Sequence, residues 1–311
     1  MYFPYLRGRQ FELLALRELA EGSLISKNII PIIEPVKLSA TIVKTLERFI
    51  ASNREIALIH NPQVGNFSND VDEQKDNLVK DKFTEFLNDD HIIRSHILNR
   101  NSKDELKELS GQGVKKENLL IICCDRDCID TYKDEFENYP PRYSLLPDES
   151  TYRRNIRKNK VLLTDKFEKQ NRNTDYANTD DEFFSDDHLF YADDGFIGFS
   201  DYSIIGEEFS ESGFAPYAVA IHIVYFDNKN NLRIKHFVSD TNDDINDPAG
   251  KFYEALDKLA KWQAKMQLDT FGMEKFMEHY KNGTYPGLGI VKKLSIMHHI
   301  ELVGQYLDGE K

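Results

Sequence analysis

The 311-residue chain has 53 acidic and 40 basic residues, which gives a formal net charge of −13, and 40% of its residues are hydrophobic. A negative surface repels phosphate, so this balance argues against direct nucleic-acid binding over the whole surface. No apolar run approaches the roughly 20 residues of a membrane-spanning helix, and the N-terminal residues are typical of a first strand rather than a signal peptide. Three cysteines without zinc or disulfide spacing favour a cytoplasmic location.

Short β-branched runs alternate with amphipathic helical segments along the first two thirds of the chain. The runs are residues 2–6, 29–33, 56–59, 92–98, 119–124, 143–146, 161–164 and 196–200. Apolar strands that alternate with helices are typical of a parallel sheet, and eight such units predict a TIM-like (β/α)8 barrel of the α/β class. The first and last strands of a closed barrel are neighbours, so we expect residues 2–6 to pair with residues 196–200.

The segment between the last two predicted strands differs from the rest of the barrel. Residues 166–195 are polar and acidic, with few large apolar side chains. Loops of this length are uncommon in compact domains and often carry function. We therefore predict a long acidic loop with at most a short helix, placed to act as a lid.

The chain beyond the predicted barrel begins with a hairpin signature. Residues 218–226 and 232–238 alternate in polarity around a polar turn, which predicts two antiparallel strands. The pair Asp247–Pro248 is typical of a helix start, with Asp as the cap and Pro in the first turn. The sequence therefore divides into a barrel core at 1–205, which includes the acidic loop, and a C-terminal β-hairpin and helical extension at 206–311 packed on the barrel.

Charged and amide side chains follow the C-terminal ends of several predicted strands. In a βα barrel these ends meet at one mouth, which is where this fold places its functional residues. The candidate catalytic residues are Glu34, His60, Asp125, Asp165 and Asp201. The candidate binding residues beside them are Arg7, Lys37 and Asn61, and Asn99 ends a neighbouring strand.

Two interpretations of this set are open. Several carboxylates at one mouth could hold a divalent metal, of unspecified identity, or act as an acid and base pair, which predicts a metal-assisted hydrolase directed at phosphodiesters. The alternative is that the Asp and Asn side chains cap the helices and turns that follow. Glu34 precedes a proline and His60 precedes Asn61-Pro62, so neither is in an ordinary cap position.

Three local motifs give further expectations. Ser39 is a plausible N-cap for the helix that follows the second strand. Ser102 and Glu105 have the spacing of a capping box. His298 and His299 lack the spacing that places two metal ligands on one helical face, so we expect no metal site there.

Five segments, 2–12, 30–35, 198–202, 236–240 and 247–252, are similar to an uncharacterised bacterial family that is known under an "sce" locus tag and is related to the beta protein family of bacteria and their phages. The resemblance spans nearly the whole chain and implies a barrel-like fold without assigned catalytic residues. Genes of this family often lie beside one for a small protein with a PD-(D/E)XK-like nuclease pattern. The resemblance therefore implies a barrel subunit or regulator of that partner, in a mobile-element or phage-defence module.

Overall fold

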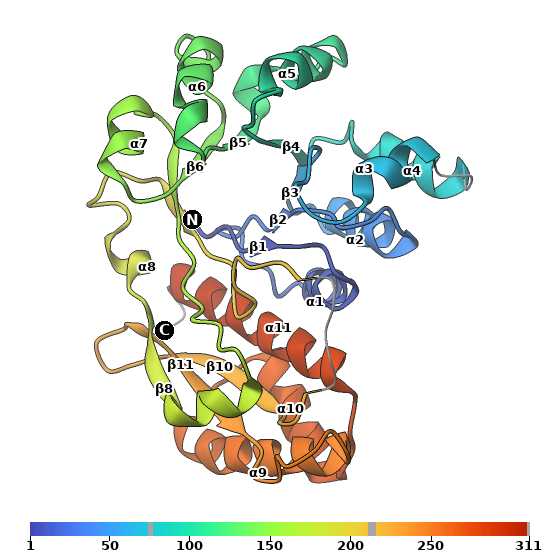
Figure 1. Ribbon diagram of the computed structural model, residues 1–311, viewed down its shortest axis with the longest axis vertical. Helices are drawn as coiled ribbons and strands as arrows, with labels where there is room; N and C mark the ends of the chain where they lie inside the picture. The colour runs from blue at the N-terminus through green and yellow to red at the C-terminus, as the bar shows by residue number, and fades with distance from the viewer. Residues whose placement is uncertain (74–76, 211–215, 310–311) are drawn as a thin grey trace.

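The computed structural model describes residues 1–73, 77–210 and 216–309. Figure 1 shows a strand-and-helix barrel above a smaller sheet, on which the helix α9 (Pro248–Met266) packs. The helix α10 (Phe271–Asn282) packs against α9. The long helix α11 (Leu288–Leu307) runs between the barrel and the smaller sheet. None of the helices within the described residues has the length and apolar character that crossing a membrane requires.

Eight parallel strands form the barrel, as predicted. They are β1 (Tyr5–Leu6), β2 (Ile32–Ile33), β3 (Ile56–Ile59), β4 (Ile92–Ile97), β5 (Leu120–Ile122), β6 (Tyr143–Leu146), β7 (Lys160–Leu163) and β9 (Gly198–Ser200). The backbone N–H of Phe3 donates to the carbonyl of Phe199 at 2.9 Å, and that of Tyr5 donates to the carbonyl of Asp201 at 2.8 Å. These bonds join the first strand to the last, so the TIM-like fold and the predicted closure are confirmed.

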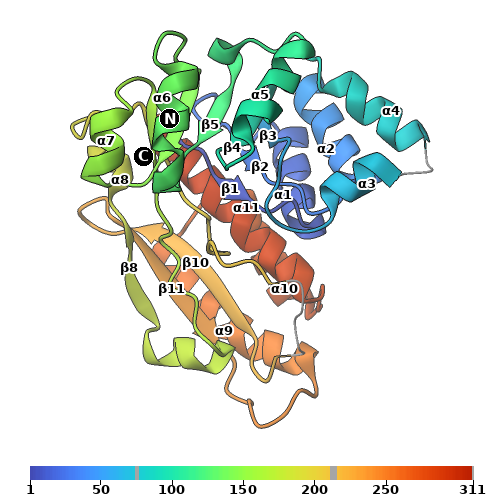
Figure 2. The ribbon, with the colours of Figure 1, turned by 45° about the horizontal axis from the view of Figure 1, so that its top comes forward.

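Helices cover the outside of the barrel (Figure 2). They are α1 (Gln10–Glu21), α2 (Ala40–Ala51), α3 (Phe67–Glu73), α4 (Asn77–Phe86), α5 (Ser102–Gly111), α6 (Ile129–Phe136) and α7 (Ser150–Asn155). Ser39 caps α2 as predicted, because its hydroxyl accepts a hydrogen bond of 3.4 Å from the N–H of Ile42.

Alternate residues of the strands fill the barrel interior. This inner cluster consists of Phe3, Tyr5, Ile30, Ile32, Ala57, Ile59, Ile93, Leu120, Ile122, Tyr143, Leu145, Val161, Leu163 and Tyr202. The intervening strand residues belong to a second cluster that packs against the helices. Because side chains alternate along a strand, the position of a residue in this series decides whether it faces the barrel interior or the helical layer.

The smaller sheet has three antiparallel strands. The predicted hairpin is confirmed as β10 (Ala220–Phe226) and β11 (Leu232–Val238), and β8 (Asp181–Ser185) pairs with the other side of β11. The prediction of a loop with at most a short helix at 166–195 is therefore wrong at β8. The short helix α8 (Asp187–Phe190) follows this strand.

Charge pairing accounts for the unexpected strand. Asp181 accepts a hydrogen bond of 2.8 Å from Nε of Arg233, and Asp180 lies 2.9 Å from Nζ of Lys235. Opposite charges on paired strands stabilise the pairing. The acidic side chains that make this segment look like a loop thus complement the basic side chains of β11.

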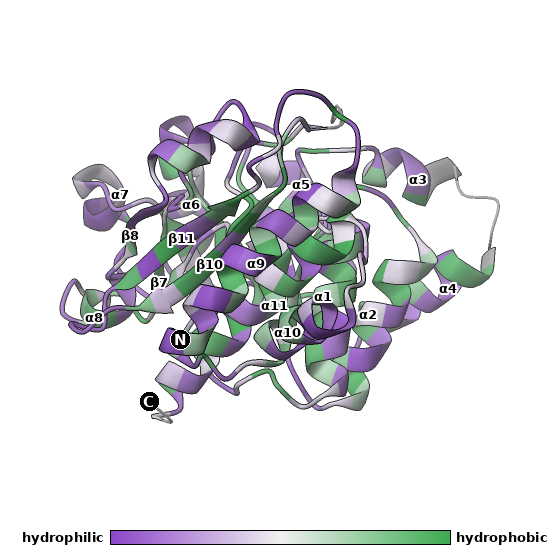
Figure 3. Cartoon of the chain, turned by 90° about the horizontal axis from the view of Figure 1, so that it is seen from below, coloured by the Kyte–Doolittle hydropathy of each residue, from purple (hydrophilic) through white to green (hydrophobic). Residues whose placement is uncertain are grey.

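The helix α11 is buried along most of its length and connects the two parts of the molecule. Nδ1 of His298 lies 2.7 Å from the hydroxyl of Thr270 at the start of α10, and its Nε2 donates to the carbonyl of Val224 at 2.7 Å. His299 instead contacts Ser203, just after the last barrel strand. Figure 3 shows the apolar character of α11 beside the more polar α9. Asp247 caps α9 as predicted, because its carboxylate accepts a hydrogen bond of 2.9 Å from the N–H of Gly250.

Candidate functional site

An ion pair closes the centre of the barrel mouth. The guanidinium carbon of Arg7 lies 5.3 and 5.2 Å from the ring centroids of Tyr5 and Tyr202. Both tyrosines belong to the inner cluster of the barrel. The carboxylate of Glu34 is 1% exposed and accepts hydrogen bonds from Arg7, from the hydroxyl of Tyr5 at 2.8 Å and from the N–H of Gln63 at 2.7 Å. Burial, together with the charge of Glu34, raises the pKa of Tyr5 well above its usual value, so this hydroxyl remains a donor.

Asp201 faces away from the barrel interior. Its carboxylate is buried and accepts hydrogen bonds from the hydroxyl of Tyr2 at 2.8 Å and from the N–H of Ser203 at 2.7 Å. Burial raises the pKa of Asp201 to about 6. Ser203 has a left-handed backbone with φ of 52°, and its hydroxyl lies 2.9 Å from Nδ1 of His299. Asp201 therefore connects the last barrel strand to the first strand and, through Ser203, to α11.

His60 belongs to an internal chain of hydrogen bonds. Its Nδ1 donates to the carbonyl of Ser95 at 2.9 Å, and burial lowers its pKa, so the ring is neutral and Nε2 is an acceptor. Nδ1 of His96 then donates to that nitrogen over 3.3 Å, and Nε2 of His96 accepts from the hydroxyl of Ser102 at 2.7 Å. Burial lowers the pKa of His96 to about 3, so both histidines of this hydrogen-bonded series are uncharged at neutral pH.

Asn61 and Asn99 meet at the carboxylate of Glu105. Their amide nitrogens donate to Glu105 at 2.9 and 3.0 Å, and Asn61 also bonds both backbone groups of Ile97. The predicted capping box is wrong for this reason, because Glu105 is engaged by the two amides and Ser102 lies inside α5, where its hydroxyl accepts from the N–H of Asn99 at 2.8 Å.

The other candidate residues act at turns or lie on the surface. Asp165 accepts hydrogen bonds from the N–H groups of Phe167 at 3.1 Å and Glu207 at 2.8 Å. Asp125 caps the short turn that follows β5 by accepting from the N–H of Asp127 at 2.9 Å. The side chain of Lys37 is exposed on the loop after β2.

The structure therefore brings together Arg7 with Glu34, and Asn61 with Asn99. Asn99 and Asp125 also line one hollow of about 790 Å3, whereas Glu34 and Asp201 lie on opposite faces of the sheet. Strand alternation explains this result, since Glu34 is in phase with the inward residues Ile30 and Ile32, whereas Asp201 is in phase with an outward position. No family model, curated protein or solved structure matches the chain. Within the described residues, no three His, Cys, Asp or Glu side chains are placed to share a metal ion.

Sequence reasoning missed the residues that hold the candidates in place. Tyr5 and Tyr202 are inward neighbours of Arg7, and strand alternation was the signal that could have found them. His96 lies inside the predicted fourth strand, where its outward position places it beside His60. The candidates were chosen by their place at a strand end, whereas the direction of each side chain follows from counting positions along the strand.

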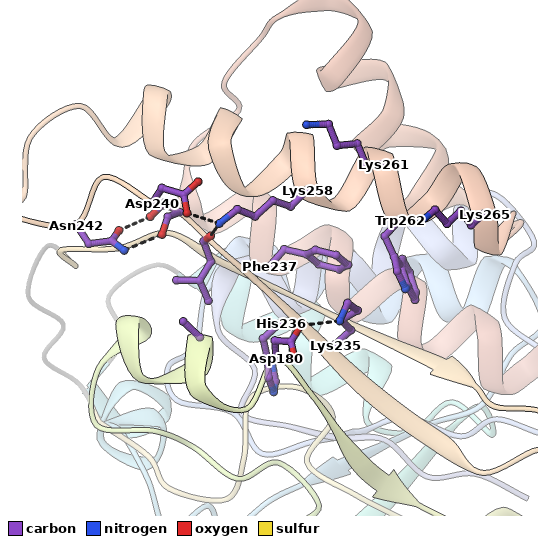
Figure 4. A pocket seen from close by; sticks show the side chains of 13 residues that line it. Asp180, Lys235, His236, Phe237, Asp240, Asn242, Lys258, Lys261, Trp262 and Lys265 are labelled. Carbon is purple, nitrogen blue, oxygen red and sulfur yellow. Dashed lines mark hydrogen bonds and ion pairs between the residues drawn. The ribbon is translucent and has the colours of Figure 1, made fainter.

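A hollow also lies outside the barrel, between α9 and β11. It has a volume of about 650 Å3 and is lined by four lysines, Lys235, Lys258, Lys261 and Lys265, together with Trp262 and Phe237. Figure 4 shows the lysines of α9 along one wall and the pair Lys235–Asp180 opposite. We call this hollow the lysine groove. The sequence signal was the spacing of three and four residues on α9, which places three lysines on one helical face.

Proposed function

We propose that this chain is a non-catalytic barrel subunit that binds and regulates a small nuclease-like partner protein. One observation carries the proposal: the four carboxylates suggested as catalytic, Glu34, Asp125, Asp165 and Asp201, all accept hydrogen bonds from the fold itself. Groups used in this way stabilise local structure and are poorly placed to bind substrate. The partner, encoded beside the gene, and the setting in a phage-defence or mobile-element module come from the family resemblance.

The three-stranded sheet is the surface that we propose for the partner. Its strand order is β10-β11-β8, so β8 is an edge strand to which, among the described residues, no further strand is paired on the outer side. Phe183 on this strand is 53% exposed. Peptides and proteins commonly bind by adding a strand to such an edge, while apolar side chains beside it supply affinity. Three cysteines without a disulfide are compatible with the cytoplasm as the place of assembly.

Co-expression with the small neighbouring protein, followed by size-exclusion chromatography, tests the proposal. We expect one shared peak for the wild-type pair and for the control Tyr139→Asp, because Tyr139 is 58% exposed but lies on the barrel beyond α6. We expect Phe183→Asp to weaken the complex about tenfold or more, as loss of a central interface anchor typically does. Separate elution of the two wild-type proteins at micromolar concentrations contradicts the proposal.

A second candidate is a metal-assisted hydrolase directed at phosphodiesters. The raised pKa of Asp201, about 6, favours it, because perturbed pKa values gather at functional sites. The placement of the residues does not fit a divalent metal, since Asp201 faces the helical layer while Glu34 is in phase with the interior. Phosphodiesterase assays on the purified chain with Mg2+ or Mn2+ test this candidate, and an activity that Asp201→Asn abolishes would establish it.

A further inference from the structure

The lysine groove has the position and size of a binding site for a small molecule. It lies between a helix and the end of a strand, and its volume of about 650 Å3 falls within the range that is usual for such sites. The side chains of α9 form one wall, and residues 235–240 at the end of β11 form the floor. Phe237 is buried beneath the groove, and its strand is paired with β10, so the floor is part of the sheet.

The lining of the groove carries more positive than negative charge. Four lysines face two aspartates, Asp180 and Asp240, among the lining residues, whereas the whole chain carries a net charge of −13. Two carboxylates outside the lining, Asp181 and Asp257, also pair with Lys235 and Lys261. Burial lowers the pKa of the remaining titratable residue of the lining, His236, so it adds no charge at neutral pH. The local excess of positive charge indicates an anionic ligand.

These lysines are available to a ligand. Lys258 lies 2.6 Å from Asp240 and also donates to the carbonyl of Val238 at 2.6 Å, and Lys261 lies 2.6 Å from Asp257 on its own helix. One side chain of each ion pair, Asp240 and Lys261, is 74% exposed to solvent. Exposed ion pairs add little to stability, so exchanging a carboxylate for a phosphate costs little. Within the described residues, Lys265 has no carboxylate in ion-pair range.

Trp262 places an aromatic ring among the cations. It follows Lys261 on α9, and its ring packs at 5.2 Å from Tyr225 and 5.4 Å from Phe237, which fixes its orientation. The indole is half-buried, and its N–H has no hydrogen-bond partner within the part of the chain that the structure describes. A planar base can pack against such a ring, and the N–H is a free donor for a phosphate or sugar oxygen.

We propose that the lysine groove binds a nucleotide polyphosphate, with its phosphates among Lys258, Lys261 and Lys265 and its base against Trp262. A triphosphate matches several lysines at once, whereas a single inorganic phosphate would leave the aromatic ring without a role. A long nucleic acid would also be repelled by the negative charge of the rest of the chain. The groove includes Asp180, which directly precedes the edge strand proposed for the partner, but the two proposals rest on different side chains, so either can fail without the other.

Titration calorimetry of the full chain with adenosine triphosphate tests the proposal, and the emission of Trp262, the single tryptophan, locates the binding. We expect saturable binding with a shift in Trp262 emission, weaker binding of tripolyphosphate, and still weaker binding of adenosine. The double variant Lys261→Gln/Lys265→Gln should lose about tenfold or more in affinity, because charge-assisted bonds to phosphate are the strong ones. The matched control is Lys103→Gln/Lys107→Gln, which removes two lysines of the same spacing on α5 and should bind like the wild type.

Three outcomes overturn the proposal. One is the absence of binding by adenosine triphosphate and tripolyphosphate. Another is binding that leaves the Trp262 emission unchanged or that the Lys261→Gln/Lys265→Gln variant retains in full. The third is tighter binding of a short oligothymidylate than of adenosine triphosphate, which would assign the groove to single-stranded nucleic acid.

Discussion

The hydroxyl of Tyr2 donates a hydrogen bond of 2.8 Å to the buried carboxylate of Asp201, and so connects the beginning of the first barrel segment with the end of the last strand. In a closed barrel this is the seam where the two ends of the sheet meet. Asp201 was a candidate for catalysis because it ends a strand. Its contacts place it at the seam, where it links the two ends of the sheet.

The pH dependence of stability should report this buried carboxylate. The pKa of Asp201 in the folded chain is about 6, against 3.8 for the free group, so its contribution to stability is fully present below about pH 4 and is lost as the pH rises through about 6. The lost stability is on the order of 3 kcal/mol, since one pKa unit corresponds to about 1.4 kcal/mol. Asp201→Asn should remove this dependence, and denaturant unfolding of both proteins between about pH 4 and pH 7.5 measures it.

The variant Tyr2→Phe provides the complementary measurement. It removes one donor to the carboxylate and leaves the burial unchanged, so it should destabilise the chain more at neutral pH, where Asp201 is charged, than at about pH 4. An equal loss at both pH values would show that the hydroxyl does not act on the charged carboxylate.

The close contact between α10 and α11 depends on a glycine. A Cβ at Gly272 would lie 2.5 Å from the carbonyl oxygen of Leu294 and 2.8 Å from the backbone nitrogen of His298, and neither backbone atom can easily move. Gly272→Ala should therefore destabilise the chain by about 1–3 kcal/mol. Gly111→Ala is the control, because no described residue outside its own turn of α5 lies within 4 Å of its Cβ, and it should be neutral or slightly stabilising.

The edge strand β8 should depend on its charge pairs. Asp181 accepts from Arg233 and from the hydroxyl of Tyr225, and it is 27% exposed at the side chain. Asp181→Ala should cost about 1 kcal/mol and increase amide exchange at Phe183 and Phe184, because cross-strand pairs are worth up to about that much. Asp130→Ala removes an exposed carboxylate on α6 and should leave that exchange unchanged.

The barrel was predictable because its strands are short apolar runs with a regular spacing. The observed strands differ from the predicted ones mainly in being a few residues shorter at their ends. The strand β8 was not predictable by the same means, since its residues Asp181 and Glu182 are unusual in strands and become favourable only beside Arg233 and His236. The candidate residues lie at the C-terminal ends of the barrel strands. Their roles depended on the direction of each side chain, which requires the register of the strand.

Glu34 is the buried carboxylate of the ion pair at the barrel mouth. It is 1% exposed and pairs with Arg7, whose side chain is 11% exposed. Removing the charge of Glu34 leaves the guanidinium with the carbonyl of Glu207 as an acceptor but without its counter-charge. Loss of one partner from a buried ion pair typically costs about 3–5 kcal/mol. A functional carboxylate commonly behaves in the opposite way, because sites kept for function reduce stability and their replacement restores it.

Thermal unfolding of Glu34→Gln, combined with the co-elution assay, therefore tests the central claim that the acidic residues of the barrel mouth stabilise the fold. For Glu34→Gln we predict a fall in melting temperature of several degrees, with partner binding retained below the new transition. For the double variant Arg7→Met/Glu34→Gln we predict a smaller fall, because neither residue of the pair then carries a buried charge. An unchanged or higher melting temperature for Glu34→Gln, together with loss of the biological function, would contradict the claim and return Glu34 to the active site of a hydrolase.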